Sequence, residues 1–327
     1  MGRELVDLFG RVHRDFRISV TDRCNFRCQY CMPEEGLDWL KREELLTFEE
    51  ITRLTKILVE NYGIHSVRLT GGEPTLRANL SDLISMLSEL PIEIALTTNG
   101  ITLEKNAHLL RSAGLSRINI SIDSLKAEKF KEITHRDEMR KVIAGIEASL
   151  EAGFSPVKIN VVAMRGVNDD EILDFAKFGR DRSVIVRFIE FMPLDADENW
   201  STSSVISQEE IFSTINSVYP LEAVERSNAP ASRFRFVDGQ GEIGIVASVS
   251  QKFCGTCDRI RITADGQFRN CLFSNEEFDL KEALRSGSSA SEICELLELA
   301  VLAKREGHGI GNVDFIRPAR SMSQIGG

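Results

Sequence analysis

Three cysteines lie close together near the start of the chain, in the stretch TDRCNFRCQYC. Cys24, Cys28 and Cys31 have the spacing C-x3-C-x2-C. Cysteine thiolates bind zinc and iron–sulfur clusters, and both centres normally take four protein ligands. A set of three predicts a centre with one open coordination position, as reactive metal sites have. Two alternatives stay open at this point: a zinc site with a distant fourth ligand, and three buried thiols that bind nothing.

A second set of three cysteines, Cys254, Cys257 and Cys271, has the spacing C-x2-C-x13-C. The remaining cysteine, Cys294, lies in an apolar helical pattern that predicts a place in the core. Taken alone, this second set could also be a zinc ribbon. Because the shortage of a fourth ligand occurs twice in one chain, we expect two incomplete clusters.

The first two thirds of the chain predict the scaffold that positions these cysteines. Short apolar strands alternate there with amphipathic helices. The strand candidates are 16–22, 66–72, 92–100, 117–123, 157–164 and 184–192. The helix candidates are 48–63, 79–90, 104–114, 139–153 and 169–179. We expect an α/β fold, and favour a partial (β/α)6 TIM-type barrel over a doubly wound sheet because no G-x-G-x-x-G motif opens the first unit. The first cysteine set follows the first strand, where such barrels carry their active sites.

The pattern changes beyond residue 220. Turns at Asp238-Gly239 and Asp265-Gly266 predict two hairpins, and helical patterns follow at 279–286 and 290–305. The last stretch is glycine-rich and basic, a composition typical of disorder. We expect three parts: a barrel over 1–220, a small α+β cluster-binding domain over 221–304, and a tail over 305–327.

Composition narrows the class of protein. The chain has 327 residues, 42% of them apolar, and a formal net charge of −10, which argues against broad binding to nucleic acid or membrane surfaces. No apolar run reaches the roughly 18 residues of a membrane span, and MGRELVDLFG is not a secretory signal. Seven cysteines without an export signal indicate a reducing compartment. We therefore expect a cytoplasmic protein.

The motif C-x3-C-x2-C with Tyr30 before the last cysteine resembles the radical S-adenosylmethionine (SAM) superfamily. TGGEP (70–74) resembles that superfamily's methionine-binding motif. The second cysteine set narrows the match, together with LTTNG, INISIDSL, RFIEFM, CDRIRIT and the terminal Gly326-Gly327. Over essentially its whole length the chain resembles the GTP 3′,8-cyclases (molybdenum cofactor biosynthesis protein A), which catalyse the first step of molybdenum cofactor biosynthesis.

The resemblance implies two [4Fe-4S] clusters, the first of which binds SAM at its free iron. The family positions that contact SAM match Tyr30, Gly72, Ser121 and Met192. The N–H groups of Gly71 and Gly72 can bind a carboxylate, and Glu73 could accept from the amino group of SAM. Taken alone, TGGEP could equally be an ordinary strand-to-helix loop.

The resemblance also implies that the free iron of the second cluster meets the guanine of GTP. The family positions that bind GTP match Arg17, Arg68, Thr97, Lys158, Arg259, Ile260 and Arg261. Arg259 and Arg261 alternate in a strand, so both face one side, and Ile260 would contact GTP through its backbone. The alternative is that both arginines face solvent along the edge of the sheet and bind no ligand. The tail glycines, Gly326 and Gly327, would lie near the catalytic arginines, Arg259 and Arg261.

Arg17, Arg68 and Lys158 each interrupt an apolar strand, where a charge is costly unless it is paired. Pointing into one lumen, the three cations are a plausible cradle for a triphosphate. The alternative is that each lies at a strand end, facing solvent or a carboxylate. Asp258 departs from the Asn expected in some relatives, and an extra carboxylate is unhelpful there unless it faces away.

The reaction that the resemblance implies begins when one electron cleaves SAM to methionine and a 5′-deoxyadenosyl radical. The radical takes the C3′ hydrogen of GTP, C3′ attacks C8, and reduction gives 3′,8-cyclo-7,8-dihydro-GTP. Implied partners are an electron donor, a downstream cyclic pyranopterin monophosphate synthase and a second copy of the chain in a homodimer. The competing interpretations are another two-cluster radical enzyme that modifies a peptide, and an electron carrier or structural zinc protein.

Overall fold

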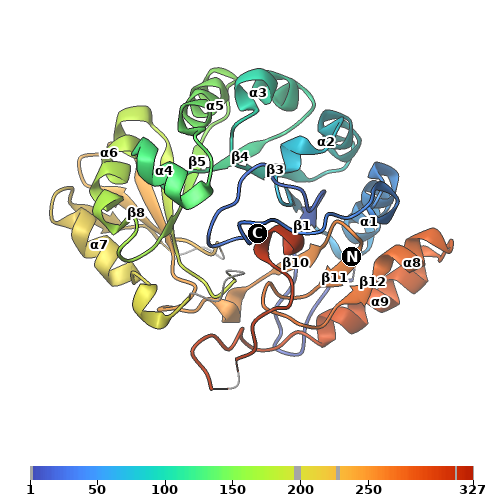
Figure 1. Ribbon diagram of the computed structural model, residues 1–327. Coiled ribbons are helices and arrows are strands. Elements are labelled where there is room, and N and C mark those ends of the chain that lie inside the picture. Colours follow the sequence, from blue (N-terminus) through green and yellow to red (C-terminus); the bar gives the residue numbers. More distant parts are fainter. Residues whose placement is uncertain (1–2, 195–199, 226–228, 314, 327) are drawn as a thin grey trace.

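Six parallel strands form the centre of the protein in the computed structural model, which describes residues 3–194, 200–225, 229–313 and 315–326. The strands lie side by side in chain order (Figure 1). They are β1 (Asp15–Ser19), β2 (Ser66–Thr70), β3 (Glu93–Thr98), β4 (Arg117–Ser121), β5 (Val157–Ala163) and β6 (Ile185–Glu190). All six strand predictions are confirmed, and the curved sheet is the expected partial TIM-type barrel.

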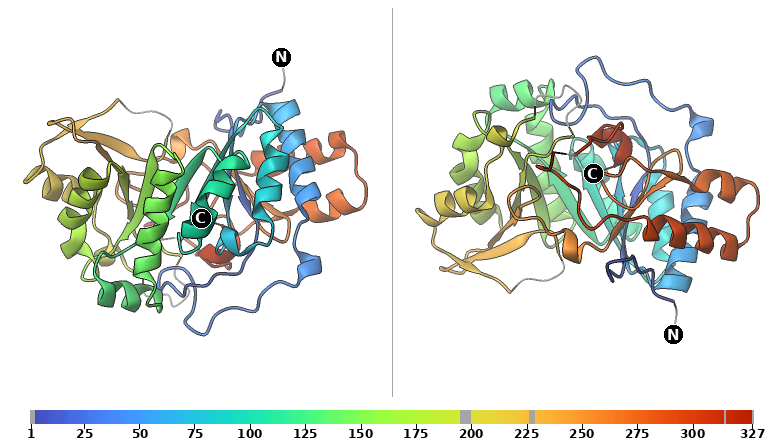
Figure 2. Two further views of the ribbon diagram at one scale, coloured as in Figure 1. Left: turned by 90° about the horizontal axis from the view of Figure 1, so that it is seen from above. Right: turned by 90° about the horizontal axis from the view of Figure 1, so that it is seen from below.

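Helices connect these strands and cover the outer face of the sheet (Figure 2). The helices α1 (Phe48–Tyr62), α2 (Leu80–Ser88), α3 (Leu103–Ser112), α5 (Met139–Glu151) and α6 (Ile172–Arg182) confirm the five helix predictions. In α1, residues Ile51, Leu54 and Leu58 are buried at helical spacing, so the apolar stripe faces the sheet. Within residues 1–220, the described helices α4 (Ala127–Thr134) and α7 (Gln208–Asn216) were not predicted. The helix α7 has a capping box at Ser207 and Glu210 that the sequence already contains.

The C-terminal third extends the same sheet at both edges. β9 (Glu242–Val246) pairs in parallel with β6, and β10 (Arg259–Ile262) pairs in parallel with β1. Short antiparallel strands follow on each side: β7 (Leu221–Ala223) and β8 (Ser232–Phe236), and β11 (Gln267–Arg269) and β12 (Phe278–Asp279). The two predicted hairpins, β8–β9 and β10–β11, are confirmed. A domain boundary at residue 220 stays a prediction, because the sheet runs continuously across it.

The helices of the C-terminal third pack beside the barrel. They are α8 (Leu280–Arg285) and α9 (Ala290–Leu302), which confirm two further predictions. The hydroxyl of Tyr62 on α1 donates to Glu298 Oε1 at 2.8 Å, so α9 is tied to α1. Cys294 is buried in this core, as expected. The described part of the tail crosses the barrel and ends in a short helix, α10 (Met322–Ile325), close to β1 and β10 (Figure 1).

The helices α3 and α5 meet at Gly145, which yields a stability prediction. A Cβ at residue 145 would lie 2.2 Å from the carbonyl oxygen of Gly100. Gly145→Ala therefore overpacks this contact, which outweighs the roughly 1 kcal/mol gain in helix propensity. We expect a net loss of about 1–2 kcal/mol in the free energy of unfolding, measured with urea.

The matched control is Glu151→Ala, which changes an exposed residue of the same helix. It should change the free energy of unfolding by less than about 0.5 kcal/mol. Equal stability of the Gly145→Ala variant and the unmodified protein would contradict this account of the α3–α5 contact.

Candidate functional site

The sheet encloses a cavity of about 280 Å³ that both cysteine sets line. Cys24 follows β1 by five residues, and Cys257 precedes β10 by two, although β1 and β10 are parallel neighbours. The two sets therefore lie near opposite ends of one strand pair. Since a strand rises about 3.3 Å per residue, the five residues of β1 alone separate them by about 16 Å.

The first cysteine set lies on a loop that the neighbouring helix α4 holds in place. The N–H groups of Arg27 and Gln29 donate to the carbonyls of Thr134 and Ile133 at 3.0 and 3.1 Å. Within the loop, the N–H of Cys31 donates to the carbonyl of Cys28 at 2.8 Å. This pairing gives the cysteine loop a defined backbone before any metal binds.

Burial and the charge of Glu73 raise the pKa of the Cys24 thiol to about 11. Burial also raises the pKa of the Cys28 and Cys31 thiols. Such thiols ionise readily only beside added positive charge, which iron ions provide. Among the described residues, no three His, Cys, Asp or Glu side chains converge on a single metal ion. A cluster differs in this respect because each thiolate binds its own iron.

The glycines of TGGEP pack directly against the backbone of the cysteine loop. A Cβ at Gly72 would lie 2.4 Å from the carbonyl oxygens of Asp22 and Arg23. The N–H of Gly72 donates to the carbonyl of Thr21 at 2.8 Å. That N–H group already has an acceptor within the protein. The sequence analysis had expected it to bind a carboxylate of the ligand. Gly72 lines the cavity, and its contact with SAM stays a prediction.

Glu73 is almost fully buried and has several donors of its own. Its Oε1 accepts from the hydroxyls of Thr75 and Thr98, each at 2.6 Å, and its Oε2 accepts from the N–H of Asn99 at 2.6 Å. These bonds join the loop after β2 to the end of β3. The predicted hydrogen bond to an amino group would have to use the remaining lone pairs of Glu73.

The half-buried Tyr30 and the buried Asp123 form a pair that the sequence analysis did not predict. The Tyr30 hydroxyl donates to Asp123 Oδ2 at 2.7 Å, and the N–H of Val162 donates to Oδ1 at 2.8 Å. Burial raises the pKa of Asp123 to about 6. Ser121 and Met192 line the same cavity, so all four predicted SAM contacts, Tyr30, Gly72, Ser121 and Met192, face one space.

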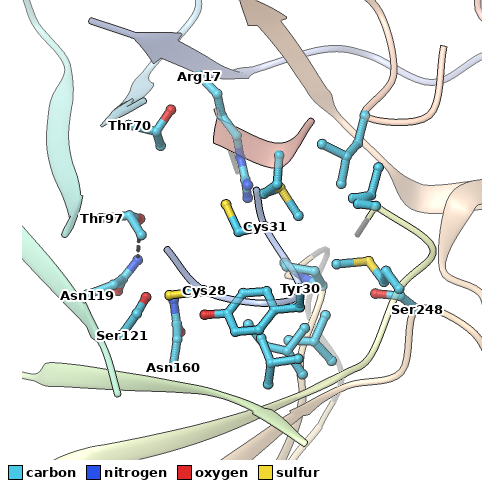
Figure 3. Close-up of a pocket in the computed structure, with 18 of the residues that line it drawn as sticks. Arg17, Cys28, Tyr30, Cys31, Thr70, Thr97, Asn119, Ser121, Asn160 and Ser248 are labelled. Carbon is cyan, nitrogen blue, oxygen red and sulfur yellow. Dashed lines mark hydrogen bonds between the residues drawn. The ribbon is translucent and has the colours of Figure 1, made fainter. Parts of the chain in front are cut away.

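Arginines from neighbouring strands form a basic wall of this cavity. Strand register places Arg17 beside both Arg68 and Arg261, and the cavity is also lined by Arg187 and Arg259. Figure 3 shows the guanidinium of Arg17 in the same space as the thiols of Cys28 and Cys31. Arg17 and Arg68 therefore line the lumen, and their role as a cradle for a triphosphate stays a prediction.

These arginines have hydrogen-bond donors to spare. Within the described part of the chain, no acceptor bonds to Arg17 Nε, to Arg68 Nε and Nη1, or to Arg187 Nε. Burial, aided by the neighbouring arginines, lowers the pKa of Arg17 to about 9 and that of Arg187 to about 10. Buried donors without partners fit an anionic ligand, which would satisfy them and offset the repulsion.

The remaining predicted GTP contacts lie at different depths. Thr97 lines the cavity, and its hydroxyl accepts from Asn119 Nδ2 at 3.4 Å (Figure 3). Ile260 is fully buried on the opposite face of its strand, as the alternation predicts. Lys158 does not line the cavity. It lies beside Arg187 and Arg117, and burial followed by the charge of Arg187 lowers its pKa to about 8.

Sequence reasoning missed several polar residues that line the cavity, among them Asn119, Asp123, Asn160 and Arg187. A signal existed for Arg187, because it stands between Val186 and Phe188 in a predicted strand. This is the same pattern that identified Arg17 and Arg68. The asparagines gave no such signal, since only the register shows that their strand positions face the lumen.

Asp258 does not line the cavity among the described residues. Its carbonyl accepts from the N–H groups of Arg14 and Asp15 at 3.0 and 3.3 Å, which anchors the start of β1. Burial and the charge of Asp15 raise the pKa of its carboxyl. The extra carboxylate is therefore not part of the cavity wall.

The tail reaches the cavity at both of its walls. The carbonyl of Gly326 accepts from Arg261 Nη1 at 3.4 Å, and the backbone N–H of Ser323 lies near the sulfur of Cys31. Gly326 has a φ of +84°, and a Cβ there would lie 2.6 Å from Thr70 Oγ1. Glycine is therefore required at 326. Gly327 lies outside the described residues.

Comparison with known proteins adds independent findings. The radical SAM superfamily matches residues 18–179, and Molybdenum Cofactor Synthesis C matches residues 184–310. The GTP 3′,8-cyclase of Streptomyces coelicolor is 45% identical over 99% of this chain and 96% of its own length. The GTP 3′,8-cyclase of Corynebacterium glutamicum is 46% identical over 99% of this chain and 90% of its own length.

Solved structures share the fold at low sequence identity. Streptococcus suis SuiB bound to S-adenosylmethionine has a TM-score of 0.64 and 13% identity, covering 90% of this chain and 69% of that one. Methylornithine synthase has a TM-score of 0.54 and 17% identity, covering 88% of this chain and 86% of that one. These likenesses support the partial barrel.

The close contact at Gly72 predicts a loss of iron. Gly72→Ala would push the cysteine loop away from β2, because the new Cβ meets two carbonyl oxygens. We expect the reconstituted variant to lose about half of its iron while the second set keeps its own. Gly166→Ala is the control: a Cβ there meets nothing within 4 Å, although its φ of +74° adds a backbone strain that Gly72 does not have. Full iron content in Gly72→Ala would contradict the prediction.

Proposed function

The chain belongs to the family of GTP 3′,8-cyclases, radical SAM lyases of molybdenum cofactor synthesis, and on that premise we propose which residues carry each part of the reaction. Cys24, Cys28 and Cys31 hold one [4Fe-4S] cluster, and the second cysteine set holds another. The observation that carries the proposal is the group of buried, unpartnered guanidinium donors in a cavity that both sets line.

SAM lies beside the first cysteine set. Tyr30, Gly72, Ser121 and Met192 surround it, and Glu73 approaches its amino group through a remaining lone pair. Met192 and the ring of Tyr30 give apolar contact, while Ser121 offers a hydroxyl. When bound, the first cluster and SAM would supply one-electron radical chemistry, which these residues would direct at C3′ of GTP.

GTP lies between the two cysteine sets, where the length of β1 leaves about 16 Å. Arg17 and Arg68, with Arg187 on the far side of the lumen, bind the triphosphate through their free N–H groups. Lys158 adds a positive charge near Arg187, although its side chain does not line the cavity. Arg259 and the backbone of Ile260 would bind nearer the second set, whose cluster would meet guanine. Arg261 lies level with Arg17, and Thr97 would bind GTP further toward the first set.

The chain's own contribution to catalysis is position and exclusion of water. The triphosphate contacts fix the ribose, so that C3′ faces the SAM side and C8 lies within reach. The tail covers the cavity: Ser323 contacts the first cysteine set and Gly326 contacts Arg261. Gly327 is assigned to the catalytic group with Gly326, Arg259 and Arg261 on the family resemblance alone.

The reaction also needs partners. An electron donor reduces the clusters, a cyclic pyranopterin monophosphate synthase uses the product, and the chain acts as a cytoplasmic homodimer. Among the described residues, no helix is long and apolar enough to cross a membrane. The deciding experiment incubates anaerobic protein with SAM, GTP and reductant. Cyclised GTP with 5′-deoxyadenosine supports the proposal, whereas 5′-deoxyadenosine without GTP consumption indicates another substrate, such as a peptide.

Removing a triphosphate donor should weaken GTP use. A hydrogen bond to a charged group contributes about 1.5–3 kcal/mol, so Arg187→Gln should lower kcat/KM for GTP about 10–100-fold. Cleavage of SAM without GTP should be unaffected, because Arg187 is not one of the proposed SAM contacts. Arg140→Gln, an exposed change on α5, is the control. Equal kcat/KM for both variants would contradict the role of Arg187.

Deleting Gly326 and Gly327 should abolish cyclisation while the iron content stays complete. The deletion removes the carbonyl that Arg261 binds, but no cysteine. Gly311→Ala serves as the control, since this tail glycine has a positive φ with open space around it. Normal turnover by the truncated chain would show that the tail end has no part in the reaction.

A further inference from the structure

Lys304 is a buried cation that the proposed reaction does not use. It lies just after α9, with only 3% of its surface exposed. Its ammonium group has three acceptors: the carbonyl of Arg259 at 2.9 Å, His13 Nδ1 at 3.5 Å and the sulfur of Cys257 at 3.8 Å. Among the described residues, no carboxylate pairs with it. A buried cation in such a place needs another source of negative charge.

His13 holds Lys304 in the donating orientation. His13 Nε2 bonds to Asp7 Oδ2 at 3.2 Å, and a carboxylate only accepts, so Nε2 carries the hydrogen. Burial and the charge of Lys304 lower the pKa of His13 to about 4, so the ring is neutral. Nδ1 is then a lone pair that accepts from Lys304. The remaining hydrogens of the ammonium group point to Arg259 and Cys257.

Arg11 fixes the same region from the N-terminal side. Its Nη1 donates to the carbonyls of Cys254 and Glu306 at 2.9 and 2.8 Å, and its Nη2 donates to that of Arg305 at 2.7 Å. Asp7 orients Arg11 through its Nε at 2.5 Å. The first residues of the chain thus brace the segment that carries Lys304 against the second cysteine set.

The two cysteine sets have opposite electrostatic surroundings. Burial and the charges of Glu73 and Asp123 act against thiolates in the first set. In the second set, the Lys304 ammonium contacts the Cys257 sulfur at 3.8 Å, and Arg259 lies beside the same sulfur. Cations and N–H···S bonds at a cluster stabilise its more negative, reduced state, and so raise its reduction potential.

We propose that Lys304 is a positioning residue that raises the reduction potential of the cluster held by Cys254, Cys257 and Cys271. It acts through its contact with the Cys257 sulfur and through its charge. The inference rests on the proposed function only in that the second set holds a cluster.

The test uses the full chain with Cys24, Cys28 and Cys31 replaced by alanine, so that only the second set binds iron. Iron is counted first, and about four irons per chain are expected. The midpoint potential is then measured by redox titration followed by electron paramagnetic resonance. A chain without iron would overturn the second cluster, and this inference with it.

In this background, Lys304→Met should lower the midpoint potential by about 59 mV or more, a tenfold change in the one-electron equilibrium. Lys304→Gln keeps a donor but loses the charge, so its potential should fall between those of the Met variant and the parent. Lys304→Arg should stay close to the parent. Arg305→Met, which removes an exposed neighbouring cation, is the matched control and should leave the potential unchanged.

If Lys304→Met loses its iron, Lys304→Gln carries the comparison, because a hydrogen bond to sulfur remains. Potentials of the Gln and Met variants equal to the parent's would overturn the proposal while leaving the second cluster in place. If Arg305→Met shifted the midpoint potential as much as Lys304→Met does, the proposal would also be overturned. The loss of any nearby positive charge would then explain the effect.

Discussion

Unpaired positive charge inside a parallel barrel is the constraint on which the rest of this structure depends. Arg17, Arg68 and Arg187 lie in the lumen, where burial lowers the pKa of each guanidinium. Their free N–H groups demand an anion or water. The apolar core and the covering helices hold the strands in one register. They thereby offset the mutual repulsion of the buried guanidinium groups.

The pairing of β10 with β1 joins this basic lumen to both cysteine sets. Although the two strands are about 240 residues apart in the sequence, Asp15 lies opposite Arg259. One set follows the end of β1, and the other precedes the start of β10. Because the strands are parallel, the sets lie at opposite ends of the same pair, and a substrate the length of a nucleotide can lie between them.

Both chain ends complete the site. The N-terminal segment reaches the second set through Arg11 and His13, and the tail reaches the first set through Ser323. The glycines at 72 and 326 allow the backbone approaches that this closure needs. The site therefore depends on segments that a strand-and-helix description of the barrel leaves out.

The sequence by itself determined the strand and helix order, because apolar periodicity and caps such as Thr47–Glu50 are local. Cysteine spacing likewise predicted two incomplete sets, and single charges in apolar strands predicted Arg17 and Arg68. Only the tertiary structure decided which strand faces share the lumen, since Asn119 and Asn160 depend on register. It also extended the sheet across residue 220 and brought Lys304 to Cys257, because such long-range contacts follow from packing and leave no periodic pattern in the sequence.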